Sequence, residues 1–251
     1  MAFSGRQVCH RTETEAKVSI AASGAPGNSD EGVNAMEKIV YPIWKPENEP
    51  VKEFKHRLLG EVSAQLIKLG ARRLTVNIVD EDVAPAEPLR IIATKPPSSG
   101  LICMWVDTAI RRKPLEEVIE KAVSRMTGYL VTESEPILNT KHPAIEGHRV
   151  HGMNSVVFLT KPPRLSHEQW LEIWHGSHTQ IAIDTQSTFG YRQNVIVRPL
   201  TYAAPPYDAI VEEDFPAAAM ADPMAFYNAV GDPAKHKKNE QTMIESCVRF
   251  I

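Results

Sequence analysis

The stretch that decides the fold is residues 165–178, Leu165-Ser166-His167-Glu168-Gln169-Trp170-Leu171-Glu172-Ile173-Trp174-His175-Gly176-Ser177-His178. Ser166 and Gln169 have the spacing of a capping box, so we predict a helix that begins just after Ser166. Trp170, Trp174 and His178 recur every four residues, which places them along one face of that helix. A histidine therefore shares a helix face with two indole rings.

Two interpretations of His178 follow from this pattern. In the first, the stripe is ordinary core and His178 is a hydrogen-bonded interior histidine. In the second, His178 lies at the edge of an apolar pocket and acts as an acid or base, because its reference pKa is close to neutrality. Apolar walls would favour the neutral imidazole, which is the form that accepts a proton. His175 lies about 60° round the helix and is predicted to be exposed.

Strands and helices follow a fixed order around this helix. Apolar runs and turn signals predict four strands and two helices in the second half of the chain. In chain order they are a strand at 155–160, the helix from His167, strands at 191–197 and 207–212, a helix that Asp222-Pro223 begins and Gly231 ends, and a last strand at 246–251. The order is therefore strand-helix-strand-strand-helix-strand.

The first half repeats this order. Its predicted elements are a strand at 39–44, a helix at 50–69, strands at 73–79 and 101–106, a helix at 114–126, and a last strand built from 129–132 and the stretch after Ile145. Phe54 aligns with Trp170, and Leu69-Gly70 aligns with Phe189-Gly190. We therefore interpret the chain as an internal duplication.

This order predicts an α+β fold of two tandem ferredoxin-like repeats, residues 36–152 and 153–251. Each repeat would form a four-stranded antiparallel sheet with both helices on one face. Two such sheets placed face to face cover each other, which gives a pseudo-dimeric α/β barrel with a pocket lined by alternate strand residues. Residues 1–35 are rich in small and polar residues and are predicted to be a disordered tail.

The composition is that of an ordinary globular protein. The chain has 251 residues, of which 43% are hydrophobic and 24% charged, with a formal net charge of −3. Lysine and arginine are scattered and the basic run at 235–238 is short, so no nucleic-acid partner is predicted. No stretch approaches the roughly 20 apolar residues of a membrane span and no secretory signal is recognisable, so no membrane partner is predicted either.

The three cysteines, Cys9, Cys103 and Cys247, lie far apart in the sequence. Their odd number and their spacing fit neither a disulfide framework nor a CxxC metal knuckle. We therefore expect a cytoplasmic protein.

The second half resembles the EthD family of dimeric α/β-barrel proteins. Members typically show a strand ending in Lys-X-Pro, a Ser- or Thr-capped helix with Trp-x-x-x-His, an aromatic-rich strand and a Tyr-Asp-Gly-x-x-Glu strand. The matching positions here are Lys161-Pro162-Pro163, Ser166, Trp174 with His178, Tyr191-Arg192-Gln193-Asn194 and Tyr207-Asp208-Ala209-Ile210-Val211-Glu212. The resemblance covers about residues 153–251, and Ala209 replaces the usual glycine.

The first repeat lacks the residues of this motif. Leu58 and Val62 stand where Trp174 and His178 would fall. We therefore expect the first repeat to close the barrel within one chain, whereas single-repeat relatives close it by pairing two chains. A further homodimer is compatible with this arrangement.

The resemblance and the strand pattern together select the candidate site residues. His178 is the predicted acid/base, and Tyr191, Asp208 and Glu212 are its candidate catalytic partners. Asp208 and Glu212 are four residues apart and would share one face of a strand. Alternatively, Asp208 ends a turn, Glu212 faces solvent and Tyr191 only packs. The predicted substrate-binding residues are Trp170, Trp174, Arg192 and Asn194.

Neither a metal site nor a cofactor is predicted. His142, His148 and His151 lie within ten residues, but their spacing suits no helical pair, and no carboxylate or thiol accompanies them in a metal motif. The sequence has no Gly-rich phosphate loop, nucleophile elbow or cofactor-lysine signature. We therefore expect cofactor-independent chemistry on a small apolar or aromatic substrate.

The wider superfamily that the resemblance implies includes isomerases, polyketide cyclases, dehydratases, decarboxylases, heme-degrading monooxygenases and members without known activity. A lyase that removes carbon dioxide or water from an aromatic or polyketide-like substrate suits the candidate residues best, because it needs one proton donor or acceptor. A cyclase or isomerase would use the same residues, and a small-molecule binding protein would need no buried titratable group. A decarboxylase would need a buried cation for the substrate carboxylate, and the candidates are Arg73, Arg149 and Arg192.

Overall fold

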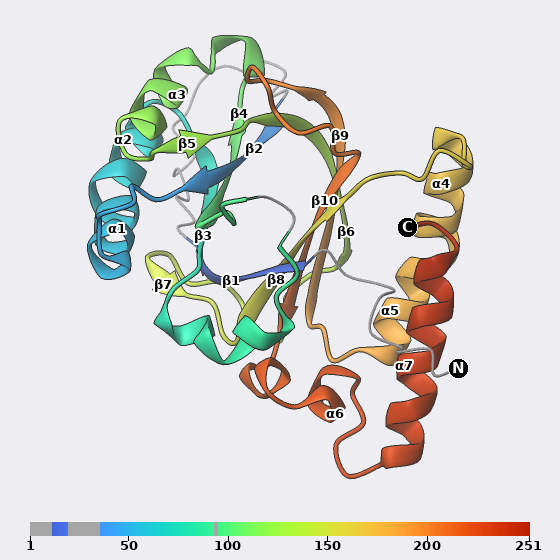
Figure 1. Cartoon of the computed structure of the whole chain (residues 1–251). Helices are drawn as coiled ribbons and strands as arrows, with labels where there is room; N and C mark the ends of the chain where they lie inside the picture. Colours follow the sequence, from blue (N-terminus) through green and yellow to red (C-terminus); the bar gives the residue numbers. More distant parts are fainter. Residues whose placement is uncertain (1–11, 20–35, 93–94) are drawn as a thin grey trace.

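A closed antiparallel barrel forms the centre of the molecule (Figure 1). The computed structural model describes residues 36–92 and 95–251 and the backbone of residues 12–19. Neighbouring strands pair in the order β3 (Arg72–Ile78), β4 (Gly100–Val106), β2 (Glu37–Trp44), β6 (Tyr129–Ile137), β9 (Gly190–Pro199), β10 (Ala209–Phe215), β8 (Met153–Leu159) and β1 (Thr12–Ser19). Strand β1 pairs in turn with β3, which closes the sheet on itself. Closure leaves none of these strands with an unpaired edge.

The first repeat has the predicted order of elements. They are β2 (Glu37–Trp44), α1 (Val51–Arg57), the π-helical turn η1 (Leu58–Val62), α2 (Ser63–Lys68), β3 (Arg72–Ile78), β4 (Gly100–Val106), α3 (Lys113–Glu120) and β6 (Tyr129–Ile137). Minor elements are η2 (Glu81–Leu89), η3 (Ala109–Arg111), β5 (Arg125–Met126) and β7 (His148–Arg149). The sheet order β3-β4-β2-β6 is that of a ferredoxin-like unit.

The second repeat follows the same plan up to its last strand. Its elements are β8 (Met153–Leu159), α4 (His167–Ile173), the π-helical turn η4 (Trp174–His178), α5 (Thr179–Thr185), β9 (Gly190–Pro199), β10 (Ala209–Phe215), η5 (Ala217–Met220), α6 (Pro223–Phe226) and α7 (Pro233–Val248). The sheet order β9-β10-β8 matches β3-β4-β2. The prediction of an α+β fold with two tandem ferredoxin-like repeats is therefore confirmed.

The last predicted strand, at 246–251, is wrong. Asp232 caps a new helix by accepting from the Lys235 amide at 2.9 Å, and Pro233 at its first turn favours a helix that continues to Val248. The position beside β8 is taken instead by β1, Thr12–Ser19, from the other end of the chain.

β1 also corrects the prediction that residues 1–35 form a disordered tail. Residues 12–19 form a strand because the edges of β8 and β3 are both open to it. Backbone hydrogen bonds to these two strands stabilise it, although its sequence is largely polar. The remainder of the predicted tail, residues 1–11 and 20–35, lies outside the described residues.

A π-helical turn interrupts the same helix in both repeats. It occupies Leu58–Val62 in the first and Trp174–His178 in the second, which are the positions that the sequence alignment equates. Each turn has a glycine at its third residue, and each is followed by a hydroxyl residue that bonds the carbonyl five residues back. These bonds are Ser63 Oγ to Leu58 O at 2.7 Å and Thr179 Oγ1 to Trp174 O at 2.9 Å. This shared detail supports the internal duplication, although the sequence predicted plain α-helices.

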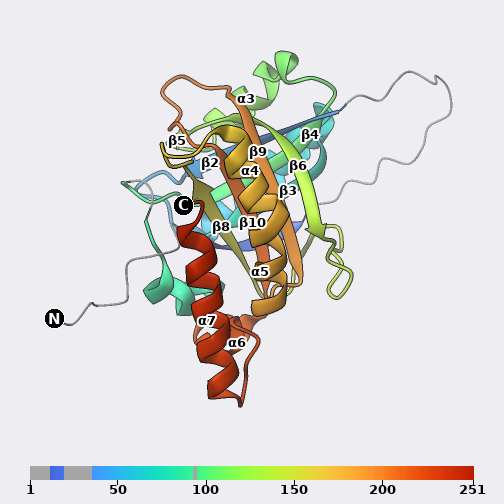
Figure 2. The same cartoon turned by 90° about the vertical axis from the view of Figure 1, so that its right-hand side faces the viewer.

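Helices cover the outer face of the barrel in two separate layers (Figures 1 and 2). α1, α2 and α3 cover the first repeat, while α4, α5 and α7 lie together over β8, β9 and β10. Each layer encloses its own apolar core against the sheet. None of the described helices is long and apolar enough to cross a membrane.

The inside of the barrel is filled by side chains. An apolar cluster packs there from both repeats, made of Val40, Leu101, Cys103, Tyr129, Val131, Val156, Phe158 and Ile210. A buried polar network lies beside this cluster. The predicted pocket between the two sheets is therefore occupied by the protein itself.

Candidate functional site

A small cavity lies between the sheet of the second repeat and its helices, on the outer face of the barrel. We call it the interlayer cavity, and it is lined by Val157, Leu159, Trp174, His178, Gln186, Tyr191, Val211, Glu213, Met243, Cys247, Phe250 and Ile251. Its volume is about 30 Å³. Because a buried water needs roughly 10–15 Å³ of cavity volume, the cavity has room for about two waters in this conformation.

His178 is held in one orientation at the wall of the cavity. It is the last residue of the π-helical turn η4 and is only 8% exposed. Its Nδ1 lies 2.9 Å from Ser246 Oγ on α7, and its ring centroid lies 4.5 Å from that of Phe250. The contacts with Ser246 and Phe250 therefore orient the His178 ring at the wall of the cavity.

Tyr191 presents its hydroxyl to the same cavity from β9. The hydroxyl oxygen accepts from Trp174 Nε1 at 3.2 Å and from Gln193 Nε2 at 3.1 Å. Gln193 Nε2 also donates to Thr179 Oγ1 at 2.7 Å, which ties the strand to the helix above it. Burial and the charge of Glu213 both raise the pKa of Tyr191, so its phenol stays protonated at neutral pH.

Glu213 is a further titratable group at the cavity, and it is not among the residues predicted from the sequence. It lies on β10 and is 9% exposed, and its carboxyl group makes no hydrogen bond within the part of the chain that the structure describes. Burial, with a smaller contribution from the charge of Asp214, raises the pKa of Glu213 to about 7. A carboxyl with such a pKa can give or take a proton near neutral pH.

The sheet separates the predicted site residues into two groups. Successive strand residues point to opposite faces, so Tyr191 and Glu213 face the helices while Arg192 and Glu212 face the inside of the barrel. Asn194 is also on the inner face, where it contacts Lys38. The expectation of one shared pocket for all these residues is therefore corrected.

The inner group belongs to a buried polar network, which we call the barrel network. Its centre is Lys38 on β2, whose Nζ contacts Glu133, lies 2.7 Å from Asn194 Oδ1 and lies 3.2 Å from Glu212 Oε1. Burial favours a lower pKa for Lys38, but the charges of Glu212, Cys103 and Glu133 outweigh it and raise the pKa. A permanent ammonium thus links the two repeats.

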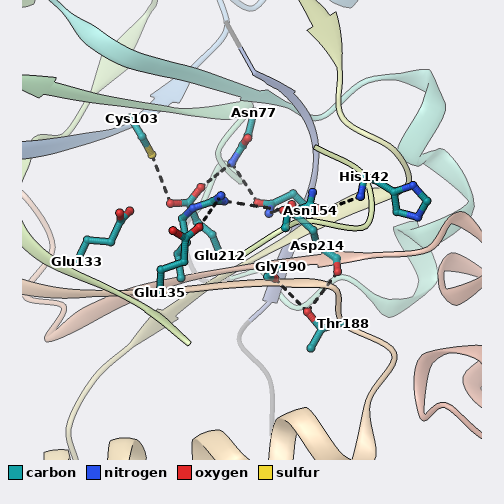
Figure 3. Close-up of polar contacts among 12 residues, drawn as sticks. Asn77, Cys103, Glu133, Glu135, His142, Asn154, Thr188, Gly190, Glu212 and Asp214 are labelled. Carbon is teal, nitrogen blue, oxygen red and sulfur yellow. Dashed lines mark hydrogen bonds and ion pairs between the residues drawn. The ribbon is translucent and has the colours of Figure 1, made fainter. Parts of the chain in front are cut away.

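Figure 3 shows side chains of both repeats converging on Glu212. Its carboxylate lies 3.5 Å from Asn77 Nδ2 and 3.7 Å from Cys103 Sγ. Asn154 continues the network by donating to Asp214 Oδ1 at 2.7 Å. Because Glu212 is 1% exposed and surrounded in this way, it neither faces solvent nor touches the interlayer cavity. The contacts of Glu212 with side chains of β2, β3 and β4 instead hold the strands of the two repeats together inside the barrel.

Two further predicted residues also lie away from the cavity. Asp208 precedes β10 and accepts from the Lys161 amide at 2.6 Å, which is the turn-ending position of the alternative interpretation. Trp170 is fully buried behind Trp174, with 5.0 Å between ring centroids, and supports it without lining the cavity.

The three clustered histidines form an aromatic contact on the surface. The rings of His142 and His151 stack at 4.0 Å, and His142 also packs edge-on against Phe189 at 4.8 Å. Within the described residues no group of three or more histidine, cysteine or acidic side chains is arranged to hold a metal ion.

The candidate cations for a substrate carboxylate lie elsewhere. Arg192 NH2 is 2.9 Å from Glu135 Oε1 on the barrel side of the sheet. The guanidinium of Arg149 contacts Asp82, and that of Arg73 lies 5.6 Å from the ring centroid of Trp105. None of the three arginines lines the interlayer cavity.

Comparison with known proteins identifies the domain that contains most of this site. Residues 162–245 match the model of the EthD domain family. No curated protein matches the sequence. Among solved structures, the crystal structure of a candidate chlorite dismutase is 13% identical, with 86% of this chain and 89% of that chain covered and a TM-score of 0.45. The motif-based prediction of an EthD domain in the C-terminal part is therefore confirmed.

Proposed function

We propose that this protein, whose C-terminal part carries an EthD domain, is a cofactor-independent lyase that works by acid–base catalysis in the interlayer cavity. Its substrate would be a small aromatic or polyketide-like molecule. The observation that carries the proposal is that His178 and Glu213 line the same largely apolar cavity. Histidine is a common acid and base in enzymes, and the raised pKa of Glu213 allows its carboxyl to exchange a proton near neutral pH.

The reaction divides between these two residues. One takes a proton from a carbon next to a substrate carbonyl, and the electron pair of that C–H bond forms a carbon–carbon double bond. The other donates a proton to the leaving hydroxyl, which departs as water as its C–O bond breaks. We assign the base to His178 and the acid to protonated Glu213, since burial favours the neutral carboxyl of Glu213.

Tyr191 supplies the remaining polar group for such a reaction. Its oxygen accepts from Trp174 and Gln193, and its phenol proton is the group that we assign to donate to a substrate carbonyl. A donor at that oxygen stabilises the negative charge that develops when the neighbouring carbon loses its proton. Tyr191 keeps its predicted place beside His178 in this proposal.

Access to the cavity requires movement of the end of α7. Met243, Cys247, Phe250 and Ile251 form that side of the wall. This end is tied to the rest of the protein by Arg249 NH2 to Ser177 Oγ at 3.0 Å, by Arg164 NH2 to Val248 O at 2.8 Å and by the buried contact of Ser246 Oγ with His178 Nδ1. Cys247 is also disulfide-bonded. Because Val248 and Ile251 at this end are exposed, we place the entry of a substrate there.

The test is mass spectrometry of a panel of aromatic and polyketide-type hydroxy ketones and acids incubated with the protein. Wild type is compared with His178→Ala and Glu213→Gln, and His175→Ala is the matched control because it lies on the same helix but does not line the cavity. We expect products lighter by one water with wild type and His175→Ala only. Equal turnover by His178→Ala and wild type would refute the assignment.

The alternative reactions give different results in the same assay. A cyclase or isomerase would give products of unchanged mass, and its activity would still depend on His178. A simple binding protein would need no titratable group in its pocket, whereas His178, Tyr191 and Glu213 line this one. The buried acid and histidine therefore favour catalysis over passive binding.

A further inference from the structure

Gln186 contributes an acceptor without a donor to the wall of the interlayer cavity. It follows the last turn of α5, where its backbone N–H bonds Ala182 O at 3.0 Å, and it is 3% exposed. Its Oε1 is buried and has no hydrogen-bond partner among the described residues. Leaving a buried amide oxygen unsatisfied costs free energy, so a ligand hydroxyl that reaches Oε1 when the cavity opens would be bound there.

The charges around the cavity are those of a site for neutral molecules. Among its described lining residues there is no lysine or arginine, and the titratable side chains include His178, Tyr191 and Glu213. A ligand carboxylate would lose its hydration among the apolar walls. It would also lie near the Glu213 carboxyl, with no lysine or arginine in the described lining to balance its charge. Arg192, a predicted cation for a substrate carboxylate and the residue next to Tyr191 in the sequence, lies on the opposite side of the sheet from the cavity.

We propose that the interlayer cavity recognises neutral, apolar molecules that carry a hydroxyl group, with Gln186 Oε1 accepting the hydrogen bond of that hydroxyl, and that it rejects carboxylic acids. Phenols, enols and hydroxy ketones are molecules of this class. The proposal rests on the proposed function in using the same site, and it narrows lyase chemistry to the loss of water, because a decarboxylase must bind a carboxylate.

The first test measures the binding of three probes of similar size to the full chain at pH 7.5 by ligand-observed NMR titration. The probes are p-cresol, which donates a hydroxyl hydrogen bond; 4-methylanisole, in which a methyl replaces that hydrogen; and benzoate. We expect p-cresol to bind at least about tenfold tighter than either of the others, since one good hydrogen bond to a buried acceptor is worth about that factor. Benzoate binding as tightly as p-cresol, or no binding of p-cresol, would overturn the proposal.

The second test assigns the preference to Gln186. Gln186→Leu removes the acceptor at similar volume and should abolish the preference for p-cresol over 4-methylanisole while leaving the affinity for 4-methylanisole within about twofold. Gln180→Leu, at an exposed position of the same helix, is the matched control and should behave as wild type. Gln186→Glu keeps an acceptor and should keep the hydroxyl preference, which provides a reading if the leucine variant does not fold. A preserved preference in Gln186→Leu would contradict the assignment.

Failure of this proposal is distinguishable from failure of the proposed function. His178→Ala should lose turnover and keep the order of probe affinities, because His178 is assigned to proton transfer rather than to selection. Turnover that survives in His178→Ala would refute the catalytic assignment alone. Carbon dioxide released from an acid by wild type would overturn the substrate class and leave a lyase in place.

Discussion

Glu213 on β10 stands directly opposite Tyr191 on β9 in the antiparallel register, so both side chains project from the same face of the sheet toward the helices. Their neighbours in the next register position, Glu212 and Arg192, project into the barrel. Adjacent residues of β10 therefore point to opposite faces of the sheet, which places the Glu213 carboxyl at the interlayer cavity and the Glu212 carboxylate in the barrel network. The charge of Glu213 also raises the pKa of Tyr191, so the two groups are electrically coupled.

The raised pKa of Glu213 predicts a particular dependence of stability on pH. Its folded-state pKa is about 7 against an ordinary 4.5, so between these values the folded protein holds a proton that the unfolded chain has released. The free energy of unfolding should therefore fall as pH rises from 4.5 to 7, by an amount on the order of 3 kcal/mol. Glu213→Gln should remove this fall and exceed wild type in stability at pH 8.

Urea unfolding at a series of pH values measures this difference. Glu168→Gln, at an exposed position of α4, is the control and should show the wild-type pH dependence. Wild-type and Glu213→Gln curves that run parallel between pH 4.5 and 8 would show that Glu213 is not buried in its neutral form.

His178 and Ser246 should separate chemistry from orientation. His178→Ala removes the base and is expected to lower kcat by about 100-fold or more, the range for loss of a general acid or base. Ser246→Ala removes only the contact to Nδ1 and should lower kcat by about tenfold with little change in KM. Ser246→Thr keeps a hydroxyl and should restore most of that loss, which a purely structural role of Ser246 would not predict.

The helix that carries His178 shows what local sequence can establish. The capping box at Ser166 was readable, and the structure has both of its hydrogen bonds. The π-helical turn at 174–178 could not be predicted from the sequence. Apolar residues spaced four apart occur equally in a regular α-helix and in a helix that contains a turn with i to i+5 hydrogen bonds. The turn is accompanied by a hydrogen bond from the Thr179 hydroxyl to Trp174 O, a single contact that has no periodic pattern in the sequence.

The choice between Glu212 and Glu213 could not be made from the sequence. β10 reads Ala-Ile-Val-Glu-Glu-Asp-Phe, apolar then acidic on both faces, and every residue of it is buried. Alternation assigns a face only where one side of a strand is polar. The family motif pointed to Glu212, whereas the tertiary partners, helices on one side and Lys38 on the other, decide the roles.

The barrel network should be costly to break from one side. Lys38→Met leaves Glu133 and Glu212 buried close together without their ammonium, and we expect it to lower the free energy of unfolding by about 3–5 kcal/mol. Lys52→Met, at an exposed position of α1, should change it by less than about 0.5 kcal/mol. Urea denaturation measures both, and adding Glu212→Gln to Lys38→Met should recover part of the loss because it removes one uncompensated charge.

β1 should be required for a monomeric barrel. Deleting residues 1–19 exposes the edges of β8 and β3, which both pair with β1, and leaves the second repeat without a fourth strand. Open edges pair with other chains, so the truncated protein should associate in size-exclusion chromatography at concentrations where the full chain does not change its elution. Replacing Thr14 and Ala16 by proline in the full chain should have the same effect, because proline cannot donate to either neighbouring strand. If both variants elute and unfold as the full chain does, barrel closure does not depend on this strand, and the second repeat must be stable with three strands alone.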